Sequence, residues 1–204
     1  MLEQASQSTA REGRLLMQEL SHRINNEYTS AINVLSLAAA RSRSSEVKAA
    51  LHDASERLHR YADVHRMLEM PEHPTCVDAA QYLRQLCLSI QQSKLDYGGI
   101  ELFLAARPLQ MQSDRCWRLG MIVYELINNA ARHAFRGPGG EISVELQPDG
   151  DFIECRVCDN GSATREIRPG RGLYIIRELA KRIDGRLVQN FGPRGSQSSV
   201  FFPA

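Results

Sequence analysis

The sequence contains no apolar run that approaches the roughly 20 residues needed to cross a bilayer. Its first residues, MLEQASQSTARE, also lack the basic start and the apolar stretch of a secretory signal peptide. Both absences predict a cytoplasmic location and no membrane partner. The composition, with 43% hydrophobic and 24% charged residues, is that of an ordinary globular protein, and 204 residues suffice for one large domain or two modest ones.

An excess of charge of one sign is absent too. The chain has 25 lysines and arginines against 24 aspartates and glutamates, so its formal net charge is +1. Nucleic acids and membrane surfaces attract strongly basic proteins. The balance of charge therefore gives no electrostatic reason to expect a nucleic acid or a membrane as partner.

The five cysteines are odd in number and lack the spacing of a disulfide framework, which suits a reducing compartment. Cys155 and Cys158 do form a C-x-x-C, but DFIECRVCDN has the pattern of a strand, in which residues three apart point to opposite faces. We interpret them as ordinary packing cysteines rather than as a zinc or redox site. No H-x-x-x-H pair occurs, and His65 lies on the apolar stripe of its helix, where we expect a packing role.

Two long helices are predicted at the start of the chain, over residues 5–42 and 44–70. Ser44 or Ser45 can cap the second helix, and Pro71 ends it. Only a few residues join the two helices, so they should pack antiparallel as a hairpin. A lone hairpin leaves half of its apolar seam exposed to water, whereas two hairpins can bury it as a four-helix bundle. We therefore expect a homodimer.

The first helix carries a histidine, His22, in the stretch ELSHRINNEY. Wound at about 100° per residue, the helix gathers apolar residues on one side, which we expect to be buried: Leu16, Leu20, Ile24, Ala31 and Leu35. The opposite side holds His22 among polar residues: Gln18, Glu19, Asn25, Asn26 and Thr29. The histidine therefore points into solvent, either as an idle surface residue or as a group that meets a reactant.

After MPEHPTC the pattern changes to helices mixed with strands. Helices are predicted at about 77–93, at 114–135 and at GRGLYIIRELAKRIDG. Strands are predicted at IELFLAA, EISVELQ, DFIECRVC, RLVQNF and SSVFF, with the turn PDG between the second and the third. This order indicates an α+β fold, an α/β sandwich with helices on one face of a largely antiparallel sheet. We divide the chain into a helical hairpin, residues 1–73, and this sandwich domain, residues 74–204.

The predicted helix over 114–135 carries a polar stripe beside its apolar face. Glu125, Asn129, Arg132 and His133 follow the spacing i, i+4, i+7 and i+8, so they share one side of the helix. Carboxylate and amide oxygens suit Mg²⁺, and arginine suits phosphate oxygens, so this side could bind a metal-bound polyphosphate. A solvated helix face is the alternative. The core face is expected a quarter turn away: Leu119, Val123, Leu126 and Ala130.

Two further segments favour a nucleotide site. In VCDNGS, Asp159 and Gly161 follow an apolar strand, where the carboxylate can accept a hydrogen bond from an adenine amino group. In RPGRGLYIIRELA, Gly170 and Gly172 precede a helix, whose first N–H groups and dipole favour phosphate. The order E-x-x-x-N, then D-x-G, then a G-x-G-L that ends at Leu173 is more specific than any of these motifs alone.

With these motifs the chain resembles the transmitter core of a two-component histidine kinase, of the type related to the HWE kinases. SHRINNEY resembles the phosphoacceptor box, ELINNAARHAF the N box, DNG the start of the G1 box and GRGLYIIRELAKRIDG the G2 box. RGSQSSVFF weakly matches the last Gly-Ser/Thr element, and the resemblance covers nearly the whole chain. The chain departs from the family at Asn25, where lysine is usual, and at Ala163, where the G1 box has its second glycine.

The resemblance implies a dimerising hairpin that carries phosphate and an ATP-binding domain of the GHKL, or Bergerat, type. On the hairpin, His22 would accept the γ-phosphoryl group of ATP and Asn26 would help to position it. In the second domain, Asn129 would ligate Mg²⁺, with Glu125 as a base or a metal-orienting carboxylate. The other implied residues bind the nucleotide: Arg132 and His133 at the phosphates, Asp159 at adenine, and Gly161, Gly170, Gly172 and Leu173 in the boxes around it. The implied partner is the receiver domain of a response regulator, whose aspartate would take the phosphoryl group.

Three functions remain open on the sequence. The first is an ATP-dependent histidine kinase, and the second is a non-enzymatic dimeric phosphotransfer protein with a decayed nucleotide site. The third is a GHKL-type serine kinase that acts on an anti-sigma partner, which the exposed His22 on a helical hairpin disfavours. Nucleotide binding separates the first from the second, and acid-labile phosphate separates both from the third.

Overall fold

The computed structural model describes residues 2–135, 137, 139–162 and 171–204. Over these residues the chain forms two compact units, Met1–Met70 and Pro71–Ala204. Among the described helices, none combines the length and the apolar character that a bilayer span requires.

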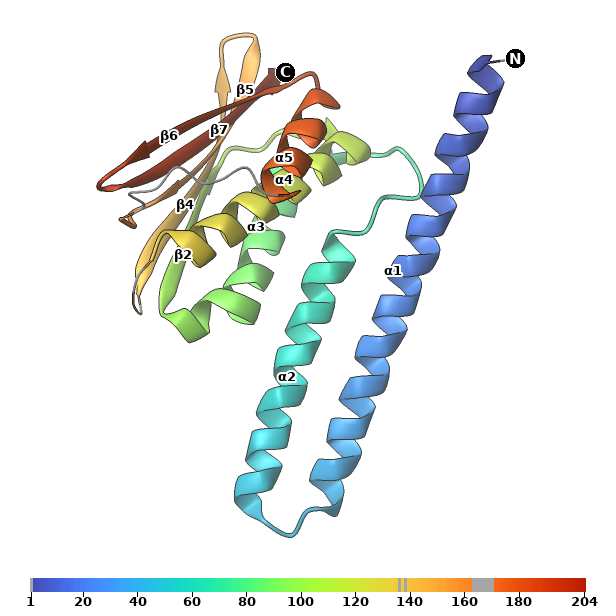
Figure 1. Cartoon of the computed structure of the whole chain (residues 1–204), viewed down its shortest axis with the longest axis vertical. Helices are drawn as coiled ribbons and strands as arrows, with labels where there is room; N and C mark the ends of the chain where they lie inside the picture. Colours follow the sequence, from blue (N-terminus) through green and yellow to red (C-terminus); the bar gives the residue numbers. More distant parts are fainter. Residues whose placement is uncertain (1, 136, 138, 163–170) are drawn as a thin grey trace. The chain divides into compact units, whose positions relative to one another are not determined.

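The first unit is a helical hairpin of α1 (Leu2–Arg41) and α2 (Ser45–Met67), which lie antiparallel (Figure 1). Ser44 caps α2, because its Oγ accepts the backbone N–H of Val47 at 3.4 Å. At the other end of α2, the N–H of Leu68 bonds back to the carbonyls of the last turn. The predicted antiparallel hairpin is confirmed.

The face of α1 that packs on α2 is not the face that we expected to be buried. The positions of this contact face are buried or half-buried: Ser21, Asn25, Tyr28, Ile32, Leu35 and Ala39. Of the expected set only Leu35 is among them, because the other members are exposed in the single chain: Leu16, Leu20, Ile24 and Ala31. That part of the prediction is wrong for one chain. Polar side chains share the contact with α2, and a second, apolar stripe of α1 stays uncovered.

The second unit is an α/β sandwich whose sheet runs in the order β2-β4-β5-β7-β6. In this sheet β2 (Ile100–Ala106) pairs parallel with β4 (Gly140–Asp149), and the other neighbours pair antiparallel. The remaining strands are β5 (Phe152–Asp159), β6 (Arg186–Gly192) and β7 (Gly195–Pro203). One face of the sheet is covered by the helices (Figure 1): α3 (Ala79–Ile90), α4 (Ser113–His133) and α5 (Arg171–Lys181). The predicted α+β sandwich is confirmed.

Short elements connect the main ones. A π-helical turn, Gln91–Leu95, and a 3-10 turn, Asp96–Gly98, lead from α3 to β2. β1 (Cys76–Asp78) and β3 (Gln110–Gln112) pair antiparallel in a separate two-stranded sheet. Runs of three residues are too short to show an alternating pattern, so periodicity does not predict β1 or β3.

The core of the second unit lies between the helices and the inner face of the sheet. The four residues expected on the core face of α4 are all buried: Leu119, Val123, Leu126 and Ala130. Cys155 of β5 is buried among them, and this burial raises the pKa of its thiol. All five cysteines are free, and among the described residues no group of three His, Cys, Asp or Glu side chains could hold a metal ion. The interpretation of Cys155 as a packing residue is confirmed, whereas Cys158 is only half-buried.

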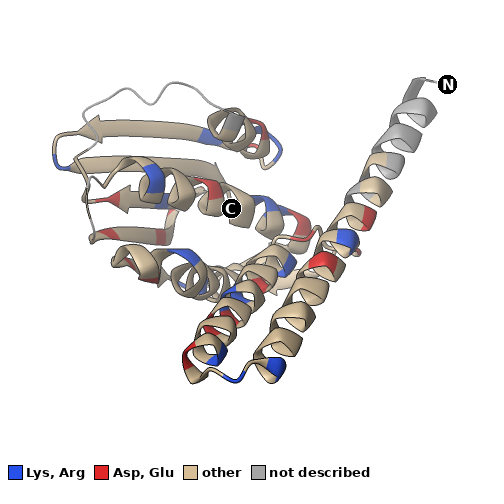
Figure 2. Ribbon diagram, turned by 60° about the horizontal axis from the view of Figure 1, so that its bottom comes forward, with Lys and Arg blue, Asp and Glu red and all other residues tan. Residues whose placement is uncertain are grey.

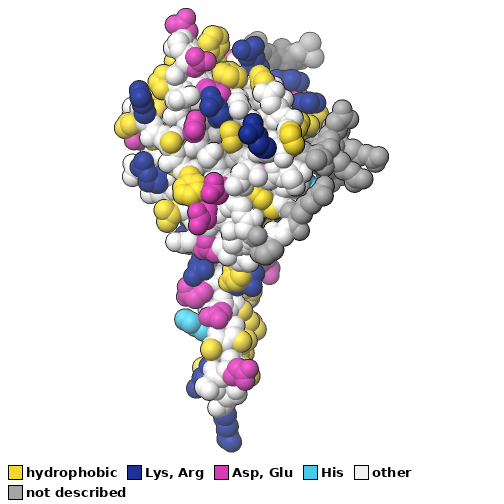
Figure 3. All heavy atoms as spheres, turned by 90° about the vertical axis from the view of Figure 1, so that its left-hand side faces the viewer, with side chains coloured by type: hydrophobic (Ala, Val, Ile, Leu, Met, Phe, Trp, Pro, Cys, Tyr) yellow, Lys and Arg dark blue, Asp and Glu magenta, His cyan; other side chains and the backbone are white. Residues whose placement is uncertain are grey.

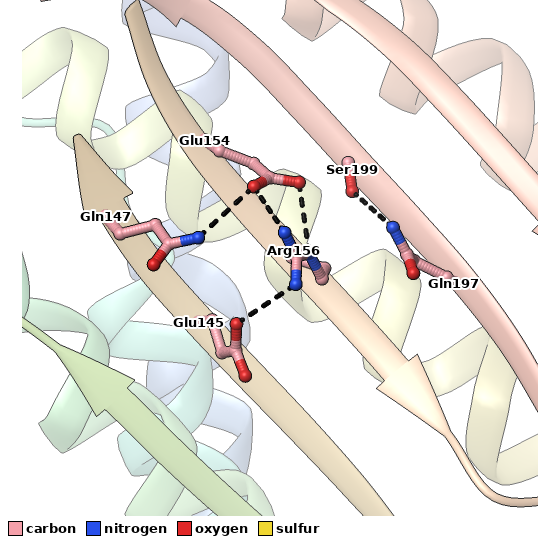
Figure 4. A network of polar contacts seen from close by, with 6 residues as sticks. All are labelled: Glu145, Gln147, Glu154, Arg156, Gln197 and Ser199. Atoms are coloured by element: carbon pink, nitrogen blue, oxygen red, sulfur yellow. Dashed lines mark hydrogen bonds and ion pairs between the residues drawn. The ribbon is translucent and has the colours of Figure 1, made fainter. Parts of the chain in front are cut away.

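The outer face of the sheet carries a polar network around Arg156 of β5 (Figure 4). Its Nε and Nη2 donate to the two oxygens of Glu154 at 3.0 and 2.6 Å, and its Nη1 lies 3.4 Å from Glu145 on β4. Gln147 donates a further bond to Glu154. The guanidinium of Arg156 holds the pKa of the Glu154 carboxyl below its usual range. This network lets a carboxylate lie almost buried on a sheet face without an unpaired charge.

Acidic and basic residues are interspersed along the described parts of both units (Figure 2), in agreement with the balanced composition. On the face drawn in Figure 3, hydrophobic, basic and acidic side chains are interspersed over the second unit. The described residues on that face therefore form no single patch of one character.

Candidate functional site

Four of the predicted site residues lie together at the end of α4. Glu125 and Asn129 are half-buried, whereas Arg132 and His133, in the last turn, are exposed. The carboxylate and the amide oxygen are therefore partly shielded from water, and the guanidinium and imidazole are free to meet a ligand. This is the donor set that suits a magnesium-bound polyphosphate, with oxygen ligands for the cation and nitrogen donors for phosphate.

Asp159 ends β5 and is buried, with 8% of its surface exposed. Its Oδ1 accepts the backbone N–H groups of Gly161 at 3.0 Å and Ser196 at 3.3 Å, and its Oδ2 accepts the hydroxyl of Ser196. An ionised carboxylate has about four acceptor positions, so three protein donors leave room for one more. The carboxylate is held rigidly and can still accept a hydrogen bond from a ligand.

Ser196 is a site residue that the sequence analysis did not single out. It lies 37 positions after Asp159, and only the pairing of β5 with β7, in which Asp159 stands opposite Ser196, brings the two together. The weak Gly-Ser motif in RGSQSSVFF is the signal that could have found it.

The turn after β5 is fastened to the end of α4. A Cβ on Gly161 would lie 2.3 Å from the carbonyl oxygen of Ala134, so only glycine fits here. The N–H of Ser162 donates to the same carbonyl at 3.0 Å. Asn160 accepts the backbone N–H of Glu141 at 2.8 Å, which holds the turn against β4. Asp159 is therefore brought next to the helix that carries Asn129 and its neighbours.

The first turn of α5 meets the polar side of α4. A Cβ on Gly172 would lie 3.1 Å from Oε2 of Glu125 and 3.7 Å from Oδ1 of Asn129. Leu173, the next residue of α5, is buried. The N box and the G2 box, distant in sequence, thus share one location. Gly170 and Ala163, two other positions named from the sequence, lie outside the described residues.

Lys94 also contacts α4 and was not among the predicted residues. Its Nζ donates to Oη of Tyr124 at 2.6 Å and to Oδ1 of Asn128 at 3.0 Å. Lys94 lies in the π-helical turn after α3, so no spacing in the sequence relates it to α4. It fixes the side chain that directly precedes Asn129.

The hairpin presents His22 and Asn26 as exposed side chains on one side of α1. The neighbouring Arg23 pairs with Glu19 at 2.9 Å along the helix. Exposure of His22 agrees with the expected position of a group that meets a reactant. His22 belongs to the first unit, whereas Glu125, Asn129 and Asp159 belong to the second.

His65 has the packing role that its position on α2 predicts. Its ring lies 6.1 Å from that of Tyr28, centroid to centroid, across the hairpin. It is half-buried, and its Nδ1 is buried with no hydrogen-bond partner among the residues that the structure describes. A ring held in this way contributes to the contact between the helices rather than to surface chemistry.

A helical hairpin with an exposed histidine, joined to an α/β sandwich with a buried aspartate at an Asp-x-Gly turn, defines a kinase-like signalling core. Residues 100–196 match the family model described as a histidine kinase-like ATPase domain, and residues 19–94 match the model described as histidine kinase. The two matches together span most of the chain, and the chain belongs to the histidine kinase family. The ATPase domain implies that the nucleotide is ATP.

Two relatives are sensor histidine kinases named PdtaS. The protein from Mycolicibacterium smegmatis is 26% identical over 196 residues, which cover 90% of this chain and 38% of that protein. The protein from Mycobacterium tuberculosis is 26% identical over 188 residues, or 84% of this chain and 36% of that protein. The chain therefore spans well under half of the length of these relatives.

Solved structures share the fold. The histidine kinase domain of the EL346 blue-light activated histidine kinase from Erythrobacter litoralis superposes with a TM-score of 0.61 at 19% identity, over 86% of this chain and 95% of that one. The histidine kinase AdeS from Acinetobacter baumannii gives 0.55 at 14% identity, over 91% and 96%. At these identities the likeness concerns the fold alone.

Proposed function

We propose that this chain is an ATP-dependent protein histidine kinase that phosphorylates its own His22 and passes the phosphoryl group to an aspartate of a response-regulator receiver domain. The observation that carries the proposal is the convergence on α4 of two distant glycine motifs. Gly161 packs on the helix end, and Gly172 packs on Glu125 and Asn129. A decayed nucleotide site would have no reason to keep such close backbone approaches.

In this proposal Asp159 reads the adenine base. Its remaining acceptor position takes an N–H of the exocyclic amino group, while Gly161 and Ser196 hold the carboxylate in place. Gly172 and Leu173 would lie next to the phosphates at the start of α5, where free backbone N–H groups favour anions. Gly170, outside the described residues, keeps the role that the resemblance implies.

The polar side of α4 would bind the magnesium ion and the phosphate groups of ATP. Asn129 would ligate Mg²⁺ through its amide oxygen, with Glu125 to orient the cation or to act as a base, and Arg132 and His133 would contact the phosphates. Magnesium, when bound, supplies charge neutralisation for the transferred group. The half-buried carboxylate and amide fit this hard, oxygen-seeking cation.

The chemical step needs a free nitrogen lone pair on His22. The imidazole nitrogen attacks the γ-phosphorus in line, an N–P bond forms, the bond from phosphorus to the bridging oxygen breaks, and ADP leaves. The phosphorylated ring, now cationic, then loses its one remaining N–H proton to a base, for which Glu125 is the candidate. An exposed position on a long helix gives the attacking ring the access that this geometry requires.

We further propose that residues 1–73 form a homodimeric bundle and residues 74–204 the ATP-binding domain. The support for dimerisation is the stripe on α1 that the single chain leaves in water, where Leu20 is 53% and Ile24 is 41% exposed. A second copy that covers this stripe would bury leucine and isoleucine side chains worth roughly 1.5–3 kcal/mol each.

Incubation of the purified chain with labelled ATP and Mg²⁺ tests the kinase proposal. We expect label that is lost in acid and retained in base, as is typical of a phosphorylated imidazole. Failure to bind ATP by calorimetry would replace the kinase by the non-enzymatic phosphotransfer protein. Label that resists acid would indicate a hydroxyl acceptor instead of a histidine.

A further inference from the structure

A hydrogen bond joins Asn25 of α1 to Glu69, which follows α2 on the other side of the hairpin. The Nδ2 of Asn25 donates a hydrogen bond of 2.5 Å to Oε1 of Glu69, in the turn that follows α2. On a helix, residues three apart are neighbours, with Cβ atoms about 5–6 Å apart, so the same amide can reach the imidazole of His22. Because His22 is exposed and Glu69 lies on the α2 side, one rotamer of Asn25 serves one contact or the other.

The orientation of the Asn25 amide depends on Glu69. A flipped amide would place Oδ1 against the carboxylate, so the N–H side must face it. The Oδ1 atom is buried and has no hydrogen-bond partner among the described residues. A buried carbonyl without a partner is unfavourable, so the bond to Glu69 is what keeps the side chain in this position.

A hydrogen bond from the Asn25 amide to His22 would lower the reactivity of the imidazole. A neutral imidazole has one N–H donor and one nitrogen with a lone pair. In the proposed reaction this lone pair attacks phosphorus. An amide N–H donated to it would have to be released before each attack.

We propose that Glu69 is a positioning residue for phosphoryl transfer: by binding the Asn25 amide across the hairpin, it keeps the nucleophilic nitrogen of His22 free. This inference rests on the proposed role of His22 as phosphoacceptor. Glu69 touches neither nucleotide nor phosphate in this account, and it acts only through Asn25.

The test compares Glu69→Leu with the double variant Asn25→Leu/Glu69→Leu in the full chain. One measurement is the rate of His22 phosphorylation from ATP in a single turnover. The other is the rate of His22 acylation by diethyl pyrocarbonate, followed by mass spectrometry of the peptide that contains it, which reports the same lone pair without ATP. Release of the amide should lower both rates about fivefold, the factor that corresponds to a neutral hydrogen bond of about 1 kcal/mol.

The double variant and two controls separate this role from a structural one. Removal of the competing amide in Asn25→Leu/Glu69→Leu should restore both rates, and the dissociation constant for ATP should be the same in all variants. Glu69→Gln keeps an acceptor for Asn25 and should keep both rates. Asp63→Leu removes another carboxylate of α2, paired with Arg66 at 3.3 Å, and should change neither. Glu69→Ala is the second release variant if Glu69→Leu does not fold.

The outcomes decide between the two proposals. If Asn25→Leu/Glu69→Leu is as slow as Glu69→Leu, the positioning role is overturned, because loss of hairpin structure would then explain the low rates of both variants. Unchanged acylation in folded Glu69→Leu and Glu69→Ala overturns it as well. If the wild-type chain takes no phosphate from ATP while the acylation rates follow the expected pattern, the kinase proposal fails and the control of His22 by Glu69 stands.

Discussion

Gly172 and Glu125 approach so closely that a Cβ built on the glycine would lie 3.1 Å from Oε2 of the carboxylate. The start of α5 is thus fitted to the polar side of α4, where the carboxylate stands beside Asn129. A side chain at this glycine must displace either the carboxylate or the helix.

We expect Gly172→Ala to impair phosphorylation and to spare stability. Inside a helix alanine is favoured over glycine by about 1 kcal/mol, so α5 itself should not suffer. The added methyl group has to move Glu125, and small misplacements in a reaction site lower rates by up to about 100-fold, so we expect a loss on the order of tenfold. Single-turnover phosphorylation and thermal unfolding are the measurements. Gly13→Ala, with no heavy atom within 4 Å of its built Cβ, is the matched control.

Asp159→Asn should weaken the binding of ATP, ADP and AMP about equally. The new amide can still accept the N–H groups of Gly161 and Ser196 through its oxygen, so the fold should survive. The adenine amino group would lose its charged acceptor, at a cost of roughly 1.5–3 kcal/mol. Calorimetry with the three nucleotides measures this. A loss confined to ATP would contradict the assignment of Asp159 to the base.

Asn129→Ala should leave Mg²⁺-free ATP binding unchanged and should remove the gain in affinity that Mg²⁺ provides. The reason is that the amide oxygen is assigned to the cation and not to the nucleotide. Titrations of ATP with Mg²⁺ and with EDTA measure the difference. Equal weakening in both would mean that Asn129 contacts the phosphates directly.

His22→Gln should abolish acid-labile label and leave ATP affinity unchanged, because the exposed imidazole packs on no core residue. His65→Gln is the matched histidine control. It removes the ring contact with Tyr28 and should lower the free energy of unfolding by about 1 kcal/mol, while phosphorylation of His22 continues. Label that survives in His22→Gln would move the phosphoacceptor to another residue.

Replacement of Leu20 and Ile24 together by glutamate should separate the dimer. Both side chains are exposed in the single chain, so the hairpin should remain helical, whereas an interface would have to bury two unpaired carboxylates. Light scattering at micromolar concentration reports the mass. Leu88→Glu on α3, where the leucine is 55% exposed, is the control and should change nothing. A monomeric wild type would count against the bundle.

The longer helices and strands could be predicted because each shows its own period, whereas β1 and β3, with three residues each, could not. The core face of α4 and the strand that holds Cys155 follow from spacing alone, and both are buried as expected. The split of α1 into two faces could not be predicted, since periodicity marks an apolar stripe without saying which neighbour covers it. Here the neighbour α2 lies against Asn25 and Tyr28 instead.

Site residues that lie on one helix could be predicted from the sequence. Site residues that the fold brings together from distant segments could not. Glu125 and Asn129 share a helix, so their common side follows from a count of residues. Ser196 meets Asp159 only through a strand pairing, and Lys94 meets Asn128, next to Asn129, only through a π-helical turn. Neither contact is visible as a spacing. The roles of all these residues remain predictions.

The pairing of β5 with β7 has a consequence for the choice of base. The pairing that sets Asp159 opposite Ser196 also sets Cys155 opposite Val200 in the core. A slip of one residue would turn Val200 to the outer face and take the Ser196 hydroxyl from the carboxylate. A guanine would present a carbonyl oxygen to the same acceptor-only carboxylate and be repelled. Under the proposed role of Asp159, discrimination against GTP would thus depend on a strand register that the packing of Val200 and Cys155 in the core helps to set.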